Sequence, residues 1–258
     1  MATLIHPTAI VAPGAQLGTD VEIGPYSIVG EHVRLGVATK IHPHVVLAGH
    51  TTIGAHCEIF PFASLGQQTQ DLKFKGGAPR VVIGDRTTLR EYVTVNAATN
   101  DGDVTRIGNG CHIMAYAHIA HDCIVGDEVI MANCGTLAGH VILEDQVIIG
   151  GLCGVHQFVR IGRLTITGGC SKVTQDLPPF MTADGNPISV HGLNAVGLKR
   201  RGVNEVAQAA LKKAYRILYR ENLTAKQALA KIEQEVELGD EVSHLVAFVR
   251  ASERGITR

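Results

Sequence analysis

Five of the 13 histidines fall close together in the sequence: His112, His118, His121, His140 and His156. An imidazole is the usual general base in enzymes because its ordinary pKa lies near neutrality. Asp122 follows His121 directly, and a carboxylate beside an imidazole can orient the ring and stabilise its charged form. A single histidine is more often structural than catalytic, so a catalytic cluster requires a fold that brings these side chains together.

A six-residue repeat supplies such a fold. From Ile5 in steps of six to Val173, 25 of the 29 positions carry an aliphatic side chain. The four exceptions are Asp71, Gly77, Asp101 and Thr167. An amphipathic helix needs apolar spacing near 3.6 and a half-buried strand needs spacing of 2, so a period of six fits neither.

This period indicates a triangular parallel β-helix, in which each six-residue unit forms one flat face and three units make a coil. We therefore predict a mainly β chain with roughly nine coils stacked about 4.8 Å apart. We expect a left-handed winding, the recognised exception to the right-handed crossover rule, although the repeat alone does not fix the hand.

Stacking of coils places residues 18 apart directly above one another. The repeat is unbroken over residues 107–161, so two columns of functional side chains are expected there. They are His121, Gly139 and Gln157 in the first column, and Asp122, His140 and Phe158 in the second. A glycine lets a substrate approach the backbone closely, so the Gly139 N–H could stabilise an oxyanion beside a histidine base.

Polar insertions and a change of period divide the rest of the chain. Residues 67–80 and about 96–106 read as loops, which are frequent places for function on a regular scaffold. The repeat ends at Pro178 and Pro179, which cannot donate in a β-ladder. We predict a left-handed β-helix domain over residues 1–180 and a C-terminal α-helical domain over residues 181–258.

The C-terminal domain is expected to contain three helices that cover the open end of the coils. Thr224 with Gln227 predicts a capping box at the start of the second helix. The apolar face expected for the first helix consists of Val206, Ala210, Ala214, Ile217 and Leu218. The face expected for the third consists of Val242, Leu245, Val246 and Val249. Residues 199–220 hold seven basic side chains against one acidic one, which indicates either a solvated helix face or a dock for an acidic partner.

Composition narrows the class of protein. Charged residues make up 18% of the chain and the net charge is −1, so no nucleic-acid partner and no stable membrane insertion are expected. The opening residues lack a basic stretch followed by an apolar run, so we expect a cytoplasmic protein with reduced cysteines. Four cysteines occupy the slot four residues after a frame aliphatic, and no C-x-x-C pair exists. We therefore predict small core side chains and no metal site.

Several strings are more specific than the repeat. They are residues 117–123 (AHIAHDC), 137–141 (LAGHV), 155–158 (VHQF), 70–73 (QDLK), 185–187 (GNP), 192–194 (GLN), 198–202 (LKRRG) and 254–258 (RGITR). Together they resemble the family of UDP-N-acetylglucosamine acyltransferases, which catalyse the first step of lipid A biosynthesis. The resemblance covers essentially the whole chain.

The resemblance implies a mechanism. His121 would take the proton from the 3-hydroxyl of the glucosamine unit, and that oxygen would attack the thioester of a 3-hydroxyacyl chain carried on acyl carrier protein. Asp122 would orient His121, and the Gly139 amide would hold the oxyanion. The acyl donor brings its own phosphopantetheine, so no other cofactor is implied.

The resemblance also implies binding residues and partners. Positions that hold the sugar nucleotide or the acyl group match Asp71, Lys73, His118, His140, His156 and Gln157. Those near the nucleotide and its phosphates match Asn194, Arg200 and Arg201. Gly169 falls at the position that limits acyl length, and with no side chain there a chain of about C14 is implied. The family is a homotrimer with active sites between neighbouring prisms, and the basic helices would dock acyl carrier protein.

Two departures from the family pattern leave the acceptor open. Residues 96–98 are Asn-Ala-Ala where the family has His-Arg-Gly, and Val196 stands where a carboxylate is common. The acceptor could therefore be UDP-N-acetylglucosamine or its 3-amino analogue.

Other classes of protein share this solenoid. A carbonic anhydrase of the gamma type would bind zinc through three histidines, which His118, His121 and His140 could imitate. The N-acyltransferase of the same pathway would have an additional N-terminal domain. A purely structural solenoid would leave the polar columns unexplained.

Overall fold

The computed structural model describes residues 3–258. The faces expected from the repeat form three sheets, here called sheets A, B and C, in which strands of successive coils pair in parallel. Sheet A contains β1 (Leu4–Ile5), β4 (Glu22–Ile23), β7 (Lys40–Ile41), β10 (Glu58–Ile59), β13 (Thr88–Leu89), β16 (His112–Ile113), β19 (Ile130–Met131), β22 (Ile148–Ile149), β25 (Ile166–Thr167), β27 (Met181–Asp184) and β28 (Ser189–Leu193). Sheet B contains β2 (Ile10–Val11), β5 (Ile28–Val29), β8 (Val46–Leu47), β11 (Ser64–Gln67), β14 (Thr94–Asn96), β17 (His118–Ile119), β20 (Thr136–Leu137), β23 (Gly154–Val155) and β26 (Lys172–Val173). Sheet C contains β3 (Gln16–Leu17), β6 (Arg34–Leu35), β9 (His50–Ile53), β12 (Arg80–Ile83), β15 (Val104–Ile107), β18 (Ile124–Val125), β21 (Ile142–Leu143) and β24 (Arg160–Ile161).

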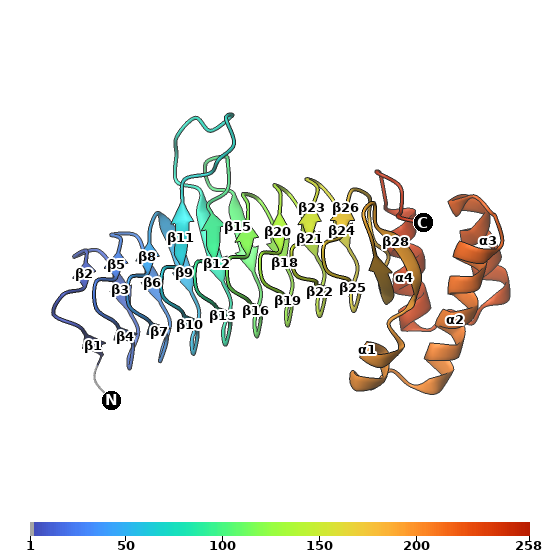
Figure 1. Cartoon of the computed structure of the whole chain (residues 1–258), viewed down its shortest axis with the longest axis horizontal. Helices are drawn as coiled ribbons and strands as arrows, with labels where there is room; N and C mark the ends of the chain where they lie inside the picture. The colour runs from blue at the N-terminus through green and yellow to red at the C-terminus, as the bar shows by residue number, and fades with distance from the viewer. Residues whose placement is uncertain (1–2) are drawn as a thin grey trace.

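The chain visits sheets A, B and C in turn and so builds a left-handed parallel β-helix. Figure 1 shows the resulting long prism, with its coils stacked from the N-terminus towards the helices. The turns make three edges, here called the AB, BC and CA corners after the sheets that they join. Paired residues lie 18 apart where no loop intervenes, as for His118 and Thr136, which confirms the stacking predicted from the repeat.

The two polar stretches are loops on one edge. Residues 68–79 connect β11 to β12, and residues 97–103 connect β14 to β15. Both connections run from sheet B to sheet C, so both loops project from the BC corner, as Figure 1 shows above β11 and β15. The sheet continues unbroken beneath them, since β9 pairs with β12 and β12 with β15 in register.

The core consists of the aliphatic frame. Ile59, Leu89 and Ile119 are fully buried, whereas Ile5, in the first coil, is 45% exposed because no coil lies beneath it. The exception Thr167 is also buried, and its hydroxyl accepts a hydrogen bond from the Gly150 N–H at 2.9 Å. A hydroxyl in the frame is tolerated there because it is hydrogen-bonded.

The cysteines of the repeat are core side chains, as predicted. Cys57, Cys111, Cys123 and Cys153 are all buried, and all six cysteines of the chain are free thiols. Burial raises the pKa of Cys111 to about 11 and that of Cys123 to about 12. Both therefore remain protonated, which makes them poor nucleophiles and poor metal ligands.

Sheet A continues past the last regular coil before the helices begin. β27 pairs in parallel with β25, and β28 returns antiparallel to it. The predicted boundary at residue 180 thus precedes this hairpin, and the first helix starts only at Ala195. The helices are α1 (Ala195–Arg200), α2 (Glu205–Arg220), α3 (Ala225–Glu235) and α4 (Asp240–Arg250).

The helices cover the C-terminal end of the prism (Figure 1). The predicted capping box is present at Thr224 and Gln227, and the predicted face of α4 is buried. The prediction for α2 was wrong at Val206, which is 68% exposed. Val206 lies in the first turn of α2, at an open groove beside the start of α4, and Leu211 is buried instead. None of the helices in residues 3–258 is both long and apolar enough to cross a membrane.

Candidate functional site

A partly buried histidine–carboxylate pair lies on the BC corner. His121 Nδ1 is 2.8 Å from Asp122 Oδ2, and the two side chains are only 15% and 9% exposed. His140 approaches from the next coil, with its Nε2 3.7 Å from the same carboxylate oxygen and its ring edge-on to His121. Asp122 and His140 each occupy a left-handed turn position, with φ near 60°, which aspartate and histidine tolerate better than most residues.

Gly139 lies directly against the His121 ring, as the column of residues 18 apart predicts. A Cβ on Gly139 would overlap the imidazole of His121, so any side chain there would force His121 to move. The Gly139 carbonyl accepts a hydrogen bond from Phe158, while the Gly139 N–H has no acceptor among the described residues. A free backbone donor beside a histidine is the arrangement that an oxyanion intermediate needs.

The second loop positions this pair. The Thr99 N–H donates to the Asp122 carboxylate at 3.2 Å, and Thr99 Oγ1 lies 3.1 Å from His121 Nδ1. The Asp122 N–H donates to Thr105 Oγ1 at 2.8 Å. A proton on Nδ1 would be shared with Asp122 and Thr99, which would leave Nε2 as the ring nitrogen able to accept a proton.

The first loop reaches the pair through Thr99. Thr69 Oγ1 lies 3.3 Å from Thr99 Oγ1, and both threonines are 5% exposed. Thr69 Oγ1 also accepts from the Asp71 N–H, and the Asp71 carboxylate accepts from the Lys73 N–H at 2.9 Å. Two buried hydroxyls therefore connect the predicted binding residues of the first loop to the His121–Asp122 pair.

A hollow opens between the two loops. It has a volume of about 640 Å³ and is lined by Lys73, Lys75, Gly76, Gly77, Thr99, Asn100 and Asp101. Lys73, expected at the substrate, and Thr99, in contact with His121, thus border the same space.

His118 lies on the same coil, on β17. Its Nδ1 is 2.7 Å from Thr94 Oγ1. Burial, and then the neighbouring His121, hold the pKa of His118 below its ordinary value. His118 is therefore neutral at pH 7 and serves as a hydrogen-bonding group rather than as a charge.

Nine predicted site residues gather along the BC corner and the adjoining edge of sheet B. They are Asp71, Lys73, His118, His121, Asp122, Gly139, His140, His156 and Gln157. The other four lie elsewhere in the same chain. Gly169 is on the AB corner between β25 and β26, while Arg201 forms an ion pair with Glu128 on the CA corner.

Asn194 and Arg200 are also placed away from the BC corner. Asn194 is the N-cap of α1: its Oδ1 accepts from the Gly197 N–H and its Nδ2 donates to the Leu164 carbonyl on the CA corner. Arg200, at the end of α1, is exposed. One chain therefore does not bring the three residues expected near the nucleotide to His121.

Three groups at this site could hold a cation. His121, Asp122 and His140 each offer a ligand atom, and these atoms lie within 4.8 Å of one another. His118, which the zinc alternative required, is not one of them. The donor set fits a transition metal chemically, but His121 Nδ1 and the Asp122 carboxylate already bond to each other and to Thr99.

The departure at residues 96–98 has a structural role. Asn96 is 6% exposed, its Nδ2 donates to the Gln68 carbonyl at 3.1 Å, and its Oδ1 accepts from Gln70 at 3.4 Å. Ala97 and Ala98 are buried. Asn96 thus holds the first loop against the second.

Sequence reasoning missed the threonines. Thr69 and Thr99 lie inside polar stretches that have no period, so nothing in the sequence shows which hydroxyl faces His121. It also missed Arg254, whose Nη2 lies 3.3 Å from His156 Nδ1 across 98 residues of chain. Arg254 belongs to one of the strings that carry the family resemblance, but the resemblance implied no role for it.

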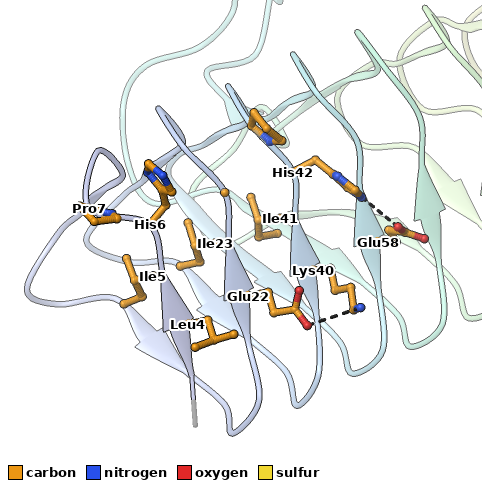
Figure 2. A pocket seen from close by; sticks show the side chains of 12 residues that line it. Leu4, Ile5, His6, Pro7, Glu22, Ile23, Lys40, Ile41, His42 and Glu58 are labelled. Atoms are coloured by element: carbon orange, nitrogen blue, oxygen red, sulfur yellow. Dashed lines mark hydrogen bonds and ion pairs between the residues drawn. The ribbon is translucent and has the colours of Figure 1, made fainter. Parts of the chain in front are cut away.

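A second groove lies far from this site. Figure 2 shows it on sheet A at the N-terminal end, where Ile5, Ile23 and Ile41 lie side by side. Its volume is about 550 Å³, and its polar rim is paired, with His42 Nε2 2.9 Å from Glu58 and Lys40 3.4 Å from Glu22. It contains none of the predicted site residues.

Two family models match parts of the chain. Residues 176–257 match the family described as "Udp N-acetylglucosamine O-acyltransferase; Domain 2", and residues 105–139 match "Bacterial transferase hexapeptide (six repeats)". An acyl-[acyl-carrier-protein]–UDP-N-acetylglucosamine O-acyltransferase from Thiobacillus denitrificans is 53% identical over the full length of both chains. The protein of that name from Herminiimonas arsenicoxydans is 49% identical over 99% of this chain and all of its own.

Solved structures of this family have the same fold as this chain. LpxA from Acinetobacter baumannii superposes with a TM-score of 0.96 at 42% identity, over 99% of this chain and all of that one. LpxA from Bacteroides fragilis, a UDP-N-acetylglucosamine acyltransferase, has the same TM-score at 37% identity and the same coverage.

Proposed function

Because the chain belongs to the family of UDP-N-acetylglucosamine O-acyltransferases, we propose that it transfers a 3-hydroxyacyl chain from acyl carrier protein to the 3-hydroxyl of UDP-N-acetylglucosamine. The observation that supports this most is the partly buried His121–Asp122 pair lying against Gly139. The ester would be the first intermediate of lipid A, and we place the reaction in the cytoplasm.

His121 acts as the general base. Its Nε2 takes the proton of the sugar 3-hydroxyl as the oxygen bonds to the thioester carbon, and Asp122 stabilises the imidazolium that results. The negative charge that develops on the carbonyl oxygen is received by the Gly139 N–H. When the C–S bond breaks, the proton passes from His121 to the departing sulfur. No nucleophilic side chain and no additional cofactor take part.

The active site is shared between copies of the chain in a homotrimer. What supports this is the distribution of the predicted residues over three different corners: His121 on BC, Gly169 on AB and Arg201 near CA. A convex prism cannot direct three of its edges at one ligand, whereas neighbouring prisms in a ring can. The sugar at His121 would then meet the nucleotide-binding residues of a second copy.

Gly169 sets the length of the acyl chain. A Cβ there would lie 3.4 Å from the Gly151 carbonyl, an ordinary contact, so a side chain could be accommodated and glycine leaves that space to the substrate. A chain of about C14 is expected, and Gly169→Met should shift the preference to a shorter donor.

Acyl transfer by the purified protein tests the reaction. The donors are 3-hydroxyacyl carrier proteins of several lengths, and the acceptors are UDP-N-acetylglucosamine and its 3-amino analogue. Transfer to the hydroxyl acceptor is the expected result. Turnover of the amino acceptor alone would mean that the acceptor, but not the reaction class, differs, whereas no transfer to either acceptor at any length would refute the proposed function.

Mixed trimers test the shared site. His121→Ala and Arg201→Ala chains, each impaired alone, are refolded together or co-expressed. A site shared between copies predicts recovered activity, because some sites then combine an intact His121 with an intact Arg201. Activity that stays at the level of the separate variants would place both residues in one chain's own site.

A further inference from the structure

The end of the BC corner beyond His121 carries an arginine with no assigned role. Gln157 lies two coils beyond His121, or roughly 10 Å along the prism. At that level Arg254, from the C-terminal tail, directs its Nη2 to within 3.3 Å of His156 Nδ1. The row of polar groups on this corner therefore ends in a guanidinium supplied by the last residues of the chain.

The tail is fixed on both sides of Arg254. The buried Asp176 carboxylate accepts from Ser252 Oγ at 2.7 Å, and the Asp176 N–H donates to the Gly255 carbonyl at 3.2 Å. The Thr257 N–H donates back to the Asp176 carbonyl at 2.8 Å. Arg254 thus extends from a backbone that is bonded to the prism, and its position relative to His121 is set by the fold.

The surroundings leave the Arg254 charge available. Among the described residues, no carboxylate lies within ion-pair distance of Arg254, whereas Arg201 and Arg250 each have one. The neighbouring Arg160 is occupied differently: it stacks over Phe248 and donates to the Ala251 carbonyl. An exposed guanidinium without a carboxylate partner, on a backbone that is bonded to the prism, is suited to bind a phosphate.

We propose that Arg254, beside His156, binds the phosphate of the phosphopantetheine arm that carries the acyl chain. This rests on the proposed function and adds to it a binding site for the donor's anion. About 13 bonds separate the thioester sulfur from the phosphorus of the arm, and an extended chain of that length spans up to about 15 Å. With the thioester at His121 and Gly139, the phosphate reaches the level of Arg254. The arm then points towards the basic helices, where the carrier protein would dock.

Three donors with the same acyl chain test the assignment: acyl carrier protein, acyl-4′-phosphopantetheine and acyl-pantetheine, which lacks the phosphate. Arg254→Gln should lower kcat/KM by about tenfold with the two phosphate-bearing donors and leave acyl-pantetheine within about twofold of the unmodified protein. Arg258→Gln is the matched control, since Arg258 lies in the same tail but donates to the Leu223 carbonyl; it should change none of the three.

Two results would overturn the assignment. An equal loss with all three donors would mean that Arg254 acts through the fold or through His156. A loss confined to the carrier protein would mean that Arg254 contacts the protein and not the phosphate. If the unmodified protein transfers the acyl chain from none of the three donors, the proposed function itself is refuted. A failure of the Arg254 assignment is different, because it is measured against an unmodified protein that is active.

Discussion

Two pairs of histidines lie on the BC corner, and they differ in spacing, ring geometry and charged neighbours. His32 and His50, near the N-terminal end, stack face to face with ring centroids 4.3 Å apart and planes within 4°. His121 and His140 meet edge-on at 5.2 Å and 88°, and the Asp122 carboxylate lies beside both rings. No carboxylate among the described residues forms an ion pair with His32 or His50.

The difference arises from the spacing along the coils and from the loops. His32 and His50 are 18 residues apart and stack in one column, whereas His121 and His140 are 19 apart and lie in neighbouring columns. Only the second pair is overlaid by the loop that contributes Thr99, and only there does an aspartate occupy the corner position. The coils thus determine where a side chain lies, and the insertions determine whether it is desolvated, oriented and paired.

The largest effect should come from exchanging the proposed base. His121→Ala removes the proton acceptor, and kcat/KM should fall by about 10²- to 10⁴-fold. His50→Ala, the matched change in the stacked pair, should leave kcat/KM within about twofold. Steady-state acyl transfer measures both. A comparable loss in the two variants would show that the comparison of the pairs is wrong and that histidines act through the stability of the coils.

Asp122→Asn tests the carboxylate that distinguishes the two pairs. The amide keeps the shape of the side chain but not its charge, so the imidazolium formed from His121 loses its counter-ion. The loss of a charge-assisted hydrogen bond predicts a fall of about 10- to 100-fold in kcat with little change in KM. A rise in KM alone would instead assign Asp122 to substrate binding.

The repeat made most of the fold predictable, and the column containing His121 and Gly139 followed from the amino-acid spacing alone. Stacking needs only the period, because a strict spacing converts sequence distance into a position in space. The contacts of Thr69, Thr99 and Arg254 have no period. They depend on how two irregular loops and a tail pack across the coils, which no local pattern encodes.

Thr99→Val should have a smaller effect, because it removes one hydroxyl and leaves the backbone N–H to Asp122 in place. A net hydrogen bond of about 1 kcal/mol predicts a fall of several-fold in kcat/KM. Thr99→Ser should restore most of the activity. The control is Thr87→Val, a buried threonine that donates to the Gly108 carbonyl, which should lower stability but not activity. Equal losses of activity in both valine variants would show that Thr99 affects activity only through packing.

The smallest effect concerns the pH dependence of stability and the partly buried His118, which differs from the exposed His32 in its environment. Burial, followed by the charge of His121, lowers the pKa of His118 in the folded protein, so the unfolded chain binds a proton more readily at this position. The free energy of unfolding therefore loses this contribution as pH falls below the unfolded pKa of about 6.5, and keeps it above that pH. The urea midpoint of His118→Gln should accordingly decrease less between pH 7.5 and 5.5 than that of the unmodified protein. Thr94→Val removes the hydrogen bond but keeps the imidazole, so its urea midpoint should show the full decrease. A smaller decrease in both variants would assign the pH dependence to other groups.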